Sequence, residues 1–262
     1  MLSSMKTFDS QSFRQFLGQP VERKYDWGTE QRFKVSKETL DAYEEMLKDT
    51  IYSHHSSFDF SDEIAGIGFP LAAQALRRRN SGNPANKYDK TQMGNLGEVI
   101  GAEFSCAYLG FQAVQTYPKR LNTNVDQAMK GVDIIGLRGR DQPAQLLIGE
   151  AKCAKQHKKE LIEDAYKHLV RLKNEEASRI LRFMKEYHRL SVNRELVENT
   201  DRHMAKSVPR DYLIISVTLT APRPPFSAIA EQVKQSPLHQ PLLAVHIQFE
   251  TKKSWLTNLF EP

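Results

Sequence analysis

The pattern of apolar and polar positions along the chain predicts helices and strands in mixed order. Apolar residues recur every three or four positions in segments that we predict to be helical, namely 37–52, 61–79, 92–109, a long region over 155–200, and 226–235. Short apolar runs predict strands at 32–35, 111–117, 131–137, 146–152, 211–220 and 242–250. This mixture favours an α/β fold, with a mixed sheet that has helices on both faces.

The segment between residues 80 and 91 divides the pattern into two parts. Its sequence, NSGNPANKYDKT, is rich in Asn, Gly, Ser and Pro, which is typical of a loop. We therefore expect a mostly helical N-terminal region over residues 1–80, with a role in partner docking, and a second domain over residues 91–262. The loop alone is too short to establish two independent domains.

The strand at 146–152 ends in residues that could take part in catalysis. Its apolar run leads into Gly149-Glu150-Ala151-Lys152. Side chains alternate between the two faces of a strand, so Glu150 and Lys152 point the same way. Burying a carboxylate and an ammonium away from water at a strand end costs free energy. They are favourable if a metal ion and a phosphate come to them.

A hairpin brings a second carboxylate to this strand end. If strands 131–137 and 146–152 pair as a hairpin, a register with Asp133 opposite Glu150 centres the turn inside RGRDQPAQ, the Pro-containing segment between them. Asp133 then lies beside Glu150 on one face, with Lys152 next along it. Two opposed carboxylates repel each other, and a hard divalent ion such as Mg²⁺ offsets that repulsion. Lys152 would orient or deprotonate an attacking water and stabilise the developing charge, which indicates phosphodiester hydrolysis.

The preceding predicted helix carries a third carboxylate, Glu98, in the sequence GNLGE. An Asp, a strand-end Glu-x-Lys and a helical Glu together resemble the PD-(D/E)xK nuclease superfamily, although Val132 stands where many members have Pro. The resemblance implies a restriction-endonuclease-like fold and a Mg²⁺-dependent endodeoxyribonuclease that also accepts Mn²⁺. Its implied catalytic residues are Asp133, Glu150, Lys152 and Glu98, and its implied metal ligands are Glu98, Asp133, Glu150 and the backbone carbonyl of Ala151.

Three motifs in order, GNLGE, GVDIIG and LLIGEAK, further resemble the HamA effector subunits of Hachiman anti-phage defence systems. By eye this similarity covers about residues 70–220 and does not extend over the first 60 residues. It implies a nuclease effector that acts on DNA and is held by a partner helicase, HamB, which senses foreign or damaged DNA.

Other residues compete for these roles. Glu-x-Lys occurs twice more, in Glu22-Arg23-Lys24 and Glu250-Thr251-Lys252, and the second also ends a predicted strand. Asp211, which begins another strand, would be its acidic partner. This second site lacks counterparts of Gly131 and Gly149, which we expect to let a ligand approach the backbone at the first. Glu103 is a rival of Glu98, which is a solvated helix carboxylate in the simplest alternative. A purely structural Asp–Lys pair is the corresponding alternative for the Glu150 site.

Charge and composition add less. A formal net charge of +5 weakly favours nucleic acid as a partner. Lys155, Lys158 and Lys159 follow the motif and either line a phosphate track or form a solvated helix face. The two cysteines predict no disulfide framework, and no apolar run approaches the ~20 residues of a membrane span, so a cytoplasmic protein is expected. The alternative to the nuclease hypothesis is a non-catalytic subunit that binds nucleic acid or a helicase. The presence of all these acidic residues argues against it, because a non-catalytic subunit does not need them.

Overall fold

A computed structural model describes residues 7–55, 89–111, 113–116, 132–138, 145–155, 159–173, 198, 210–219, 226–238, 240–251 and 253–260. The predicted helix over 61–79, most of the loop over 80–91, and Lys158 lie outside the described residues, as does much of the helical region predicted over 155–200. The last three residues of the predicted loop are helical, because helix α5 (Asp89–Ala107) already begins there.

A seven-stranded mixed sheet in the order β1-β2-β7-β6-β5-β4-β3 forms the centre of the protein. The strands are β1 (Val21–Tyr25), β2 (Gly28–Val35), β3 (Ala113–Thr116), β4 (Ile134–Arg138), β5 (Gln145–Ala154), β6 (Arg210–Thr218) and β7 (Leu242–Phe249). The four inner strands β2, β7, β6 and β5 run parallel, and antiparallel hairpin strands flank them. The α/β class and the mixed sheet are as predicted.

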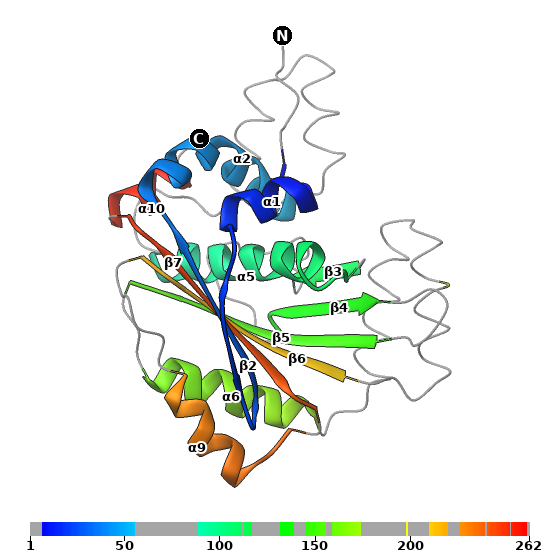
Figure 1. Cartoon of the computed structure of the whole chain (residues 1–262). Helices are drawn as coiled ribbons and strands as arrows, with labels where there is room; N and C mark the ends of the chain where they lie inside the picture. The colour runs from blue at the N-terminus through cyan, green and yellow to red at the C-terminus, as the bar shows by residue number, and fades with distance from the viewer. Residues whose placement is uncertain are drawn as a thin grey trace.

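One face of the sheet is covered by α5, and α5 is covered in turn by α1 (Ser10–Leu17), α2 (Lys37–His55) and α10 (Lys253–Leu259) (Figure 1). Two glycines let α5 lie close to the strands. A Cβ on Gly101 would come within 2.3 Å of the Ile134 side chain, and one on Gly97 within 3.1 Å of Cys153 Cβ. The small-residue side of α5 therefore packs on the sheet at the end of β5. Phe104 belongs to the hydrophobic cluster that also contains Ile134.

The opposite face is covered by α6 (Lys159–Lys173) and α9 (Ser227–Gln235) (Figure 1). Residues at helical spacing on α6 pack against alternate residues of β5 and β6, and the cluster includes Ile162, Ala165, Leu169, Ile148 and Ile214. Because β5, β6 and β7 are parallel neighbours joined through α6 and α9, two crossovers of the same hand place both helices on one face.

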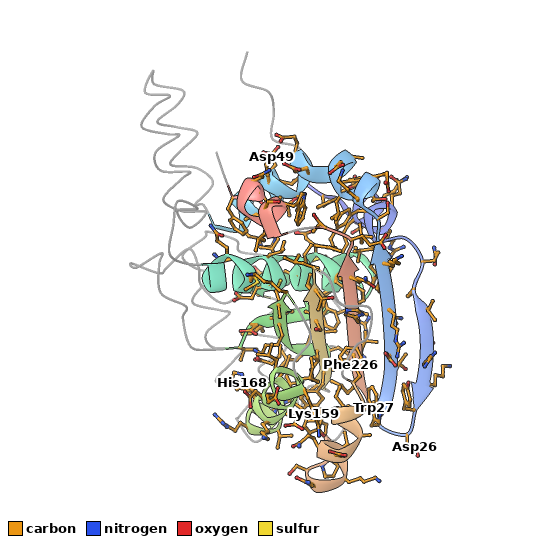
Figure 2. The ribbon with its side chains drawn as sticks, turned by 90° about the vertical axis from the view of Figure 1, so that its left-hand side faces the viewer. Asp26, Trp27, Asp49, Lys159, His168 and Phe226 are labelled. Atoms are coloured by element: carbon orange, nitrogen blue, oxygen red, sulfur yellow. The ribbon has the colours of Figure 1, made fainter. Side chains whose placement is uncertain are left out.

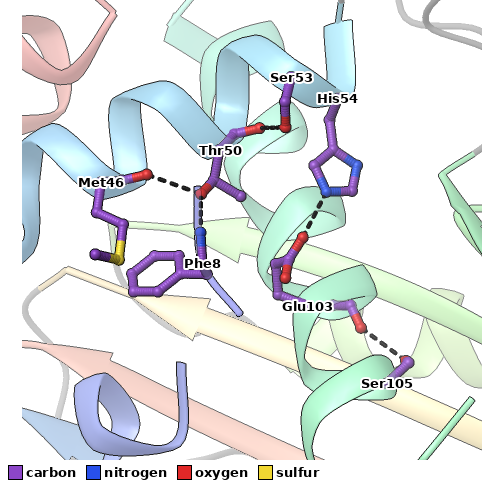
Figure 3. A network of polar contacts seen from close by, with 8 residues as sticks. Phe8, Met46, Thr50, Ser53, His54, Glu103 and Ser105 are labelled. Carbon is purple, nitrogen blue, oxygen red and sulfur yellow. Dashed lines mark hydrogen bonds and ion pairs between the residues drawn. The ribbon is translucent and has the colours of Figure 1, made fainter. Parts of the chain in front are cut away.

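The N-terminal region is built into the sheet. The predicted strand at 32–35 is longer than expected, and β2 pairs with β7 from Gly28 to Val35. Within the N-terminal region, the Phe8 N–H donates to Thr50 Oγ1 at 3.0 Å (Figure 3). The region also contacts α5, because His54 Nε2 on α2 lies 2.7 Å from Glu103 Oε1. One hydrophobic cluster thus joins residues from both sides of the predicted loop. Sequence patterning did not predict α1, β1 or α10.

Candidate active site

Glu150 and Lys152 lie at the carboxyl end of β5, on the face that α6 and α9 cover. Leu146 and Ile148 precede them on this face and belong to its hydrophobic cluster. The burial of the strand leaves the side chain of Glu150 only 1% exposed, whereas Lys152 is 26% exposed. Gly149, which we expected to admit a ligand, instead makes room for its neighbours, because a Cβ there would lie 3.1 Å from Ile134 Cβ.

The hairpin between β4 and β5 has the predicted register. Ile134 pairs with Gly149 and Arg138 with Gln145, so Asp133 is the residue next to Glu150. Since β4 begins only at Ile134, Asp133 lies just outside the ladder. Its Oδ2 accepts a hydrogen bond from the Ala151 N–H at 3.0 Å. If β4 began earlier in the chain, a backbone carbonyl of that strand would accept this hydrogen bond instead. The carboxylate of Asp133 is thereby tied to the end of β5.

The ammonium of Lys152 lies between the two carboxylates. Its Nζ is 2.9 Å from Glu150 Oε2 and 3.4 Å from Asp133 Oδ2. On the other side, Nδ1 of His168 on α6 lies 2.6 Å from Glu150 Oε1, the distance of an ion pair when the imidazole is protonated. Figure 2 shows His168 on α6, the helix that also carries Lys159. Sequence reasoning missed His168. The available signal was its place beside the apolar stripe of α6, three residues after Ala165.

Burial and neighbouring charges together shift the pKa values of these groups. Burial raises the pKa of Asp133 to about 7, and the negative charge of Glu150 adds to the effect. Burial would also raise the pKa of Glu150, but contacts with His168 and Lys152 outweigh it and lower that pKa. The two carboxylates in turn raise the pKa of Lys152 against the effect of burial, and Glu150 raises the pKa of His168. Burial and the charge of Glu150 thus disfavour the ionised form of Asp133, and a further cation beside it would favour that form.

Glu98 lies on the helix that covers the other face of the sheet, and its charge acts on the cluster. Its helix, α5, passes over the end of β5, where Gly97 lies against Cys153. The charge of Glu98 contributes to the raised pKa of Asp133. Within the part of the chain that the structure describes, no three His, Cys, Asp or Glu side chains form a group that could hold a metal ion.

The chain matches the sequence model of the HamA family over residues 19–234. It belongs to the HamA family. A curated relative, the Hachiman protein HamA of Bacillus cereus, is 38% identical over 79 residues, which make up 30% of this chain. The aligned part spans about a quarter of that relative, 27% of its length. The family match begins well before the limit of about residue 70 that the motifs indicated, and it includes all four predicted catalytic residues.

In this HamA-family chain, the lysines after the motif occupy different settings. Lys155 is exposed in a bend directly after β5. Lys159, at the start of α6, pairs with Glu163 at 3.3 Å and with Glu231 at 3.2 Å. Lys159 would have to exchange these carboxylates for a phosphate in order to contact DNA. None of the helices in the described part of the chain has the length and apolar character needed to cross a membrane.

Those rival residues that the structure describes do not gather into a second cluster. β6 and β7 are parallel neighbours, so Asp211 at the start of β6 is level with residue 241 and nine residues, or roughly 30 Å, from Glu250 after β7. Glu250 pairs with Lys34 at 2.6 Å, and Glu103 pairs with His54. Glu22 lies on the exposed edge strand β1, where it accepts a hydrogen bond from Gln31 Nε2. Cys153 is a packing residue under Gly97.

Proposed function

We propose that this HamA-family chain is a metal-dependent nuclease that hydrolyses phosphodiester bonds of DNA, as the cytoplasmic effector of an anti-phage defence complex. The observation that carries the proposal is the ammonium of Lys152 between the carboxylates of Glu150 and Asp133 at the end of β5. Its place in the HamA family and its relative, named as a Hachiman protein, support the defence role. We further propose a helicase of the HamB type as its partner and the N-terminal region as the docking region.

The carboxylates suit a divalent ion. Lys152 Nζ already occupies the position of a cation between them, and burial, with the charge of Glu150, raises the pKa of Asp133, so a cation beside this carboxyl would favour its ionised form. Mg²⁺ is commonly held by one or two carboxylates together with water and phosphate oxygens. Asp133 and Glu150 would hold Mg²⁺ or Mn²⁺. An ion bound there supplies charge neutralisation and a more acidic water.

The carbonyl of Ala151 is a further ligand candidate. In an extended strand the N–H and C=O of one residue point to the same side. The Ala151 N–H points at Asp133, so its carbonyl faces that side as well, beyond the last pair of the β4–β5 ladder. Glu98 would act at longer range, by orienting water around the ion, since it does not close a three-carboxylate group with the other two.

Lys152 would orient the attacking water and stabilise the charge that develops on the phosphate. The two carboxylates raise its pKa, which favours its protonated form at neutral pH and therefore argues against a role as general base. Exposed Lys155, together with Lys158 and Lys159, would follow the DNA backbone once Lys159 has left its carboxylate partners.

The decisive experiment compares two matched variants on plasmid DNA, with the chain alone and with its helicase partner. Glu150→Gln keeps the shape of the side chain but removes the proposed ligand charge. Glu250→Gln makes the same change at the other strand-end Glu-x-Lys. We expect cleavage with Mg²⁺ that EDTA stops, a loss of roughly 10³-fold or more in Glu150→Gln, because several kcal/mol of transition-state stabilisation are removed, and a normal rate in Glu250→Gln.

If the wild-type complex with its helicase does not cut DNA in Mg²⁺ or Mn²⁺, the nuclease proposal is wrong. The alternative function, a non-catalytic subunit that binds nucleic acid or helicase, then remains. If cleavage occurs but Glu150→Gln cuts at the wild-type rate, the nuclease has a different active site.

A further inference from the structure

Each carboxylate oxygen of Glu150 faces a different basic residue: Oε2 accepts a hydrogen bond from Lys152, whereas buried Oε1 has no hydrogen bond of good geometry within the described residues and lies at ion-pair distance from His168. Lys152, on the same strand, lies 2.9 Å from Oε2. His168, on the helix that covers this face, lies 2.6 Å from Oε1. Lys152 and Oε2 are on the side of Asp133, because the same ammonium also contacts Asp133. His168 therefore takes the oxygen that is directed away from the second carboxylate.

We propose that His168 is a positioning residue of this active site, which holds Oε1 of Glu150 so that Oε2 points toward Asp133 as a ligand for the divalent ion. The inference rests on the nuclease function proposed above and extends it to a residue outside the Asp…Glu-x-Lys motif. His168 acts through Glu150 and does not itself contact the ion.

The setting of His168 suits such a role. Helix α6 is fixed on the sheet by Ile162, Ala165 and Leu169, which are at most 1% exposed, so the imidazole is presented from a rigid element. Tyr166, a nearby polar residue on α6, is engaged elsewhere, because its hydroxyl donates to the Ser236 carbonyl at 2.8 Å. Groups that hold the free side of a metal ligand fix its orientation, and their loss typically weakens metal binding by about 10- to 100-fold.

The direction of the effect separates positioning from simple charge. If His168 served only as a positive charge, its removal would take a cation away from the site, and a divalent ion would bind more tightly. If His168 positions Glu150, its removal frees the carboxylate to rotate, and the ion binds more weakly. The sign of the change in metal affinity therefore distinguishes the two roles without any measurement of cleavage.

The test is Mn²⁺ binding to the full chain, measured by calorimetry or by electron paramagnetic resonance of free Mn²⁺. His168→Ala removes the contact. His168→Asn keeps an N–H donor at the position of Nδ1 without a positive charge. Lys167→Ala removes an exposed cation from the same helix as a control. We expect Mn²⁺ to bind about 10-fold more weakly to His168→Ala than to the wild type. His168→Asn and Lys167→Ala should bind Mn²⁺ with near wild-type affinity.

In cleavage assays, His168→Ala should require more metal for half-maximal rate, while the KM for DNA stays unchanged. Circular dichroism establishes that each variant is folded, and His168→Asn tests the donor even if His168→Ala is unstable. Equal or tighter Mn²⁺ binding by folded His168→Ala, or weak binding by folded His168→Asn, would overturn the role of His168 and leave the nuclease proposal standing. A wild-type chain that binds no Mn²⁺ and a complex that cuts no DNA would overturn both.

Discussion

In the sequence, one Glu-x-Lys lies near the carboxyl end of β5 and another begins directly after the parallel strand β7, yet among the described residues only the first builds a cluster of charges. At the end of β5, Glu150 is 1% exposed and contacts Lys152 and His168, with Asp133 adjacent. At the end of β7, the side chain of Glu250 is 39% exposed and pairs with Lys34 of the neighbouring strand. The same three-residue pattern thus gives a largely buried charge cluster in one place and an ordinary surface ion pair in the other.

The direction of the neighbouring strand explains the difference. β5 has an antiparallel neighbour, β4, so the residue just before β4 lies beside the carboxyl end of β5. That residue is Asp133. β7 has parallel neighbours on both sides, so the acid that begins β6, Asp211, lies at the opposite end of the sheet. An Asp at the start of a strand therefore meets a Glu-x-Lys near the end of the neighbouring strand only when the two strands are antiparallel.

The largest difference between the two strand ends should appear on removal of Lys152. Breaking a buried ion pair costs about 3–5 kcal/mol, and because Lys152 is 26% exposed we expect Lys152→Ala to lose about 2–3 kcal/mol of unfolding free energy in EDTA. Mn²⁺ should restore much of this loss, because the ion then takes the position of the ammonium without displacing it. Urea unfolding with and without Mn²⁺ measures both effects. Equal stabilisation of the wild type and of Lys152→Ala by Mn²⁺ would contradict a shared cation position.

Asp133→Asn should change stability in a pH-dependent way. The pKa of Asp133 in the folded chain, about 7, lies above its ordinary value of 3.8, so the folded chain binds more protons between these pH values and wild-type stability falls as pH rises through them. The full shift corresponds to about 4 kcal/mol, and partial exposure of the carboxyl reduces our expectation to about 1–2 kcal/mol. In EDTA, Asp133→Asn should therefore be more stable than wild type at pH 8 and equal to it at pH 4.

The matched control for this measurement is Asp164→Asn, at an exposed position of α6. It should alter stability little at either pH. A stability difference between Asp133→Asn and wild type that is the same at pH 4 and pH 8 would show that the carboxyl does not titrate as described.

The smallest effect should come from the end of β7. Lys34→Ala breaks an ion pair whose side chains are 64% and 39% exposed, and such pairs contribute no more than about 0.5 kcal/mol. The loss should vanish in high salt, because screening acts on exposed charges. Urea unfolding of Lys34→Ala at low and high ionic strength measures it. A loss as large as that of Lys152→Ala would remove the contrast between the two strand ends.

The sequence predicted the local part of the site well. The hairpin register followed from the position of the turn and the alternation of side chains, and it placed Asp133 beside Glu150 before any coordinates were known. The strand order could not be predicted in this way. β2 pairs with β7 across more than 200 residues, and nothing in their apolar patterns marks them as neighbours. Alternation fixes the face of a residue but not the neighbour of its strand.

His168 marks the same limit at the site. The apolar stripe of α6 predicts which side of the helix faces the sheet. It does not predict how far along β5 the helix crosses, and that distance decides whether His168 meets Glu150 or solvent. Glu98 was found because its motif resembles a family pattern. His168 belongs to no such pattern and became visible only through its 2.6 Å contact with Glu150.

The central place of β7 has a consequence for biosynthesis. β7 lies between β2 and β6, although it is the last of the three to be made and follows β2 by more than 200 residues. During translation the edges of β2 and β6 that pair with β7 therefore remain unpaired until residue 249 has left the ribosome. Unpaired strand edges invite pairing with other chains. A nascent or prematurely terminated chain that stops short of β7 is thus a candidate for aggregation and for rescue by chaperones, and the sheet closes in a single late step of synthesis.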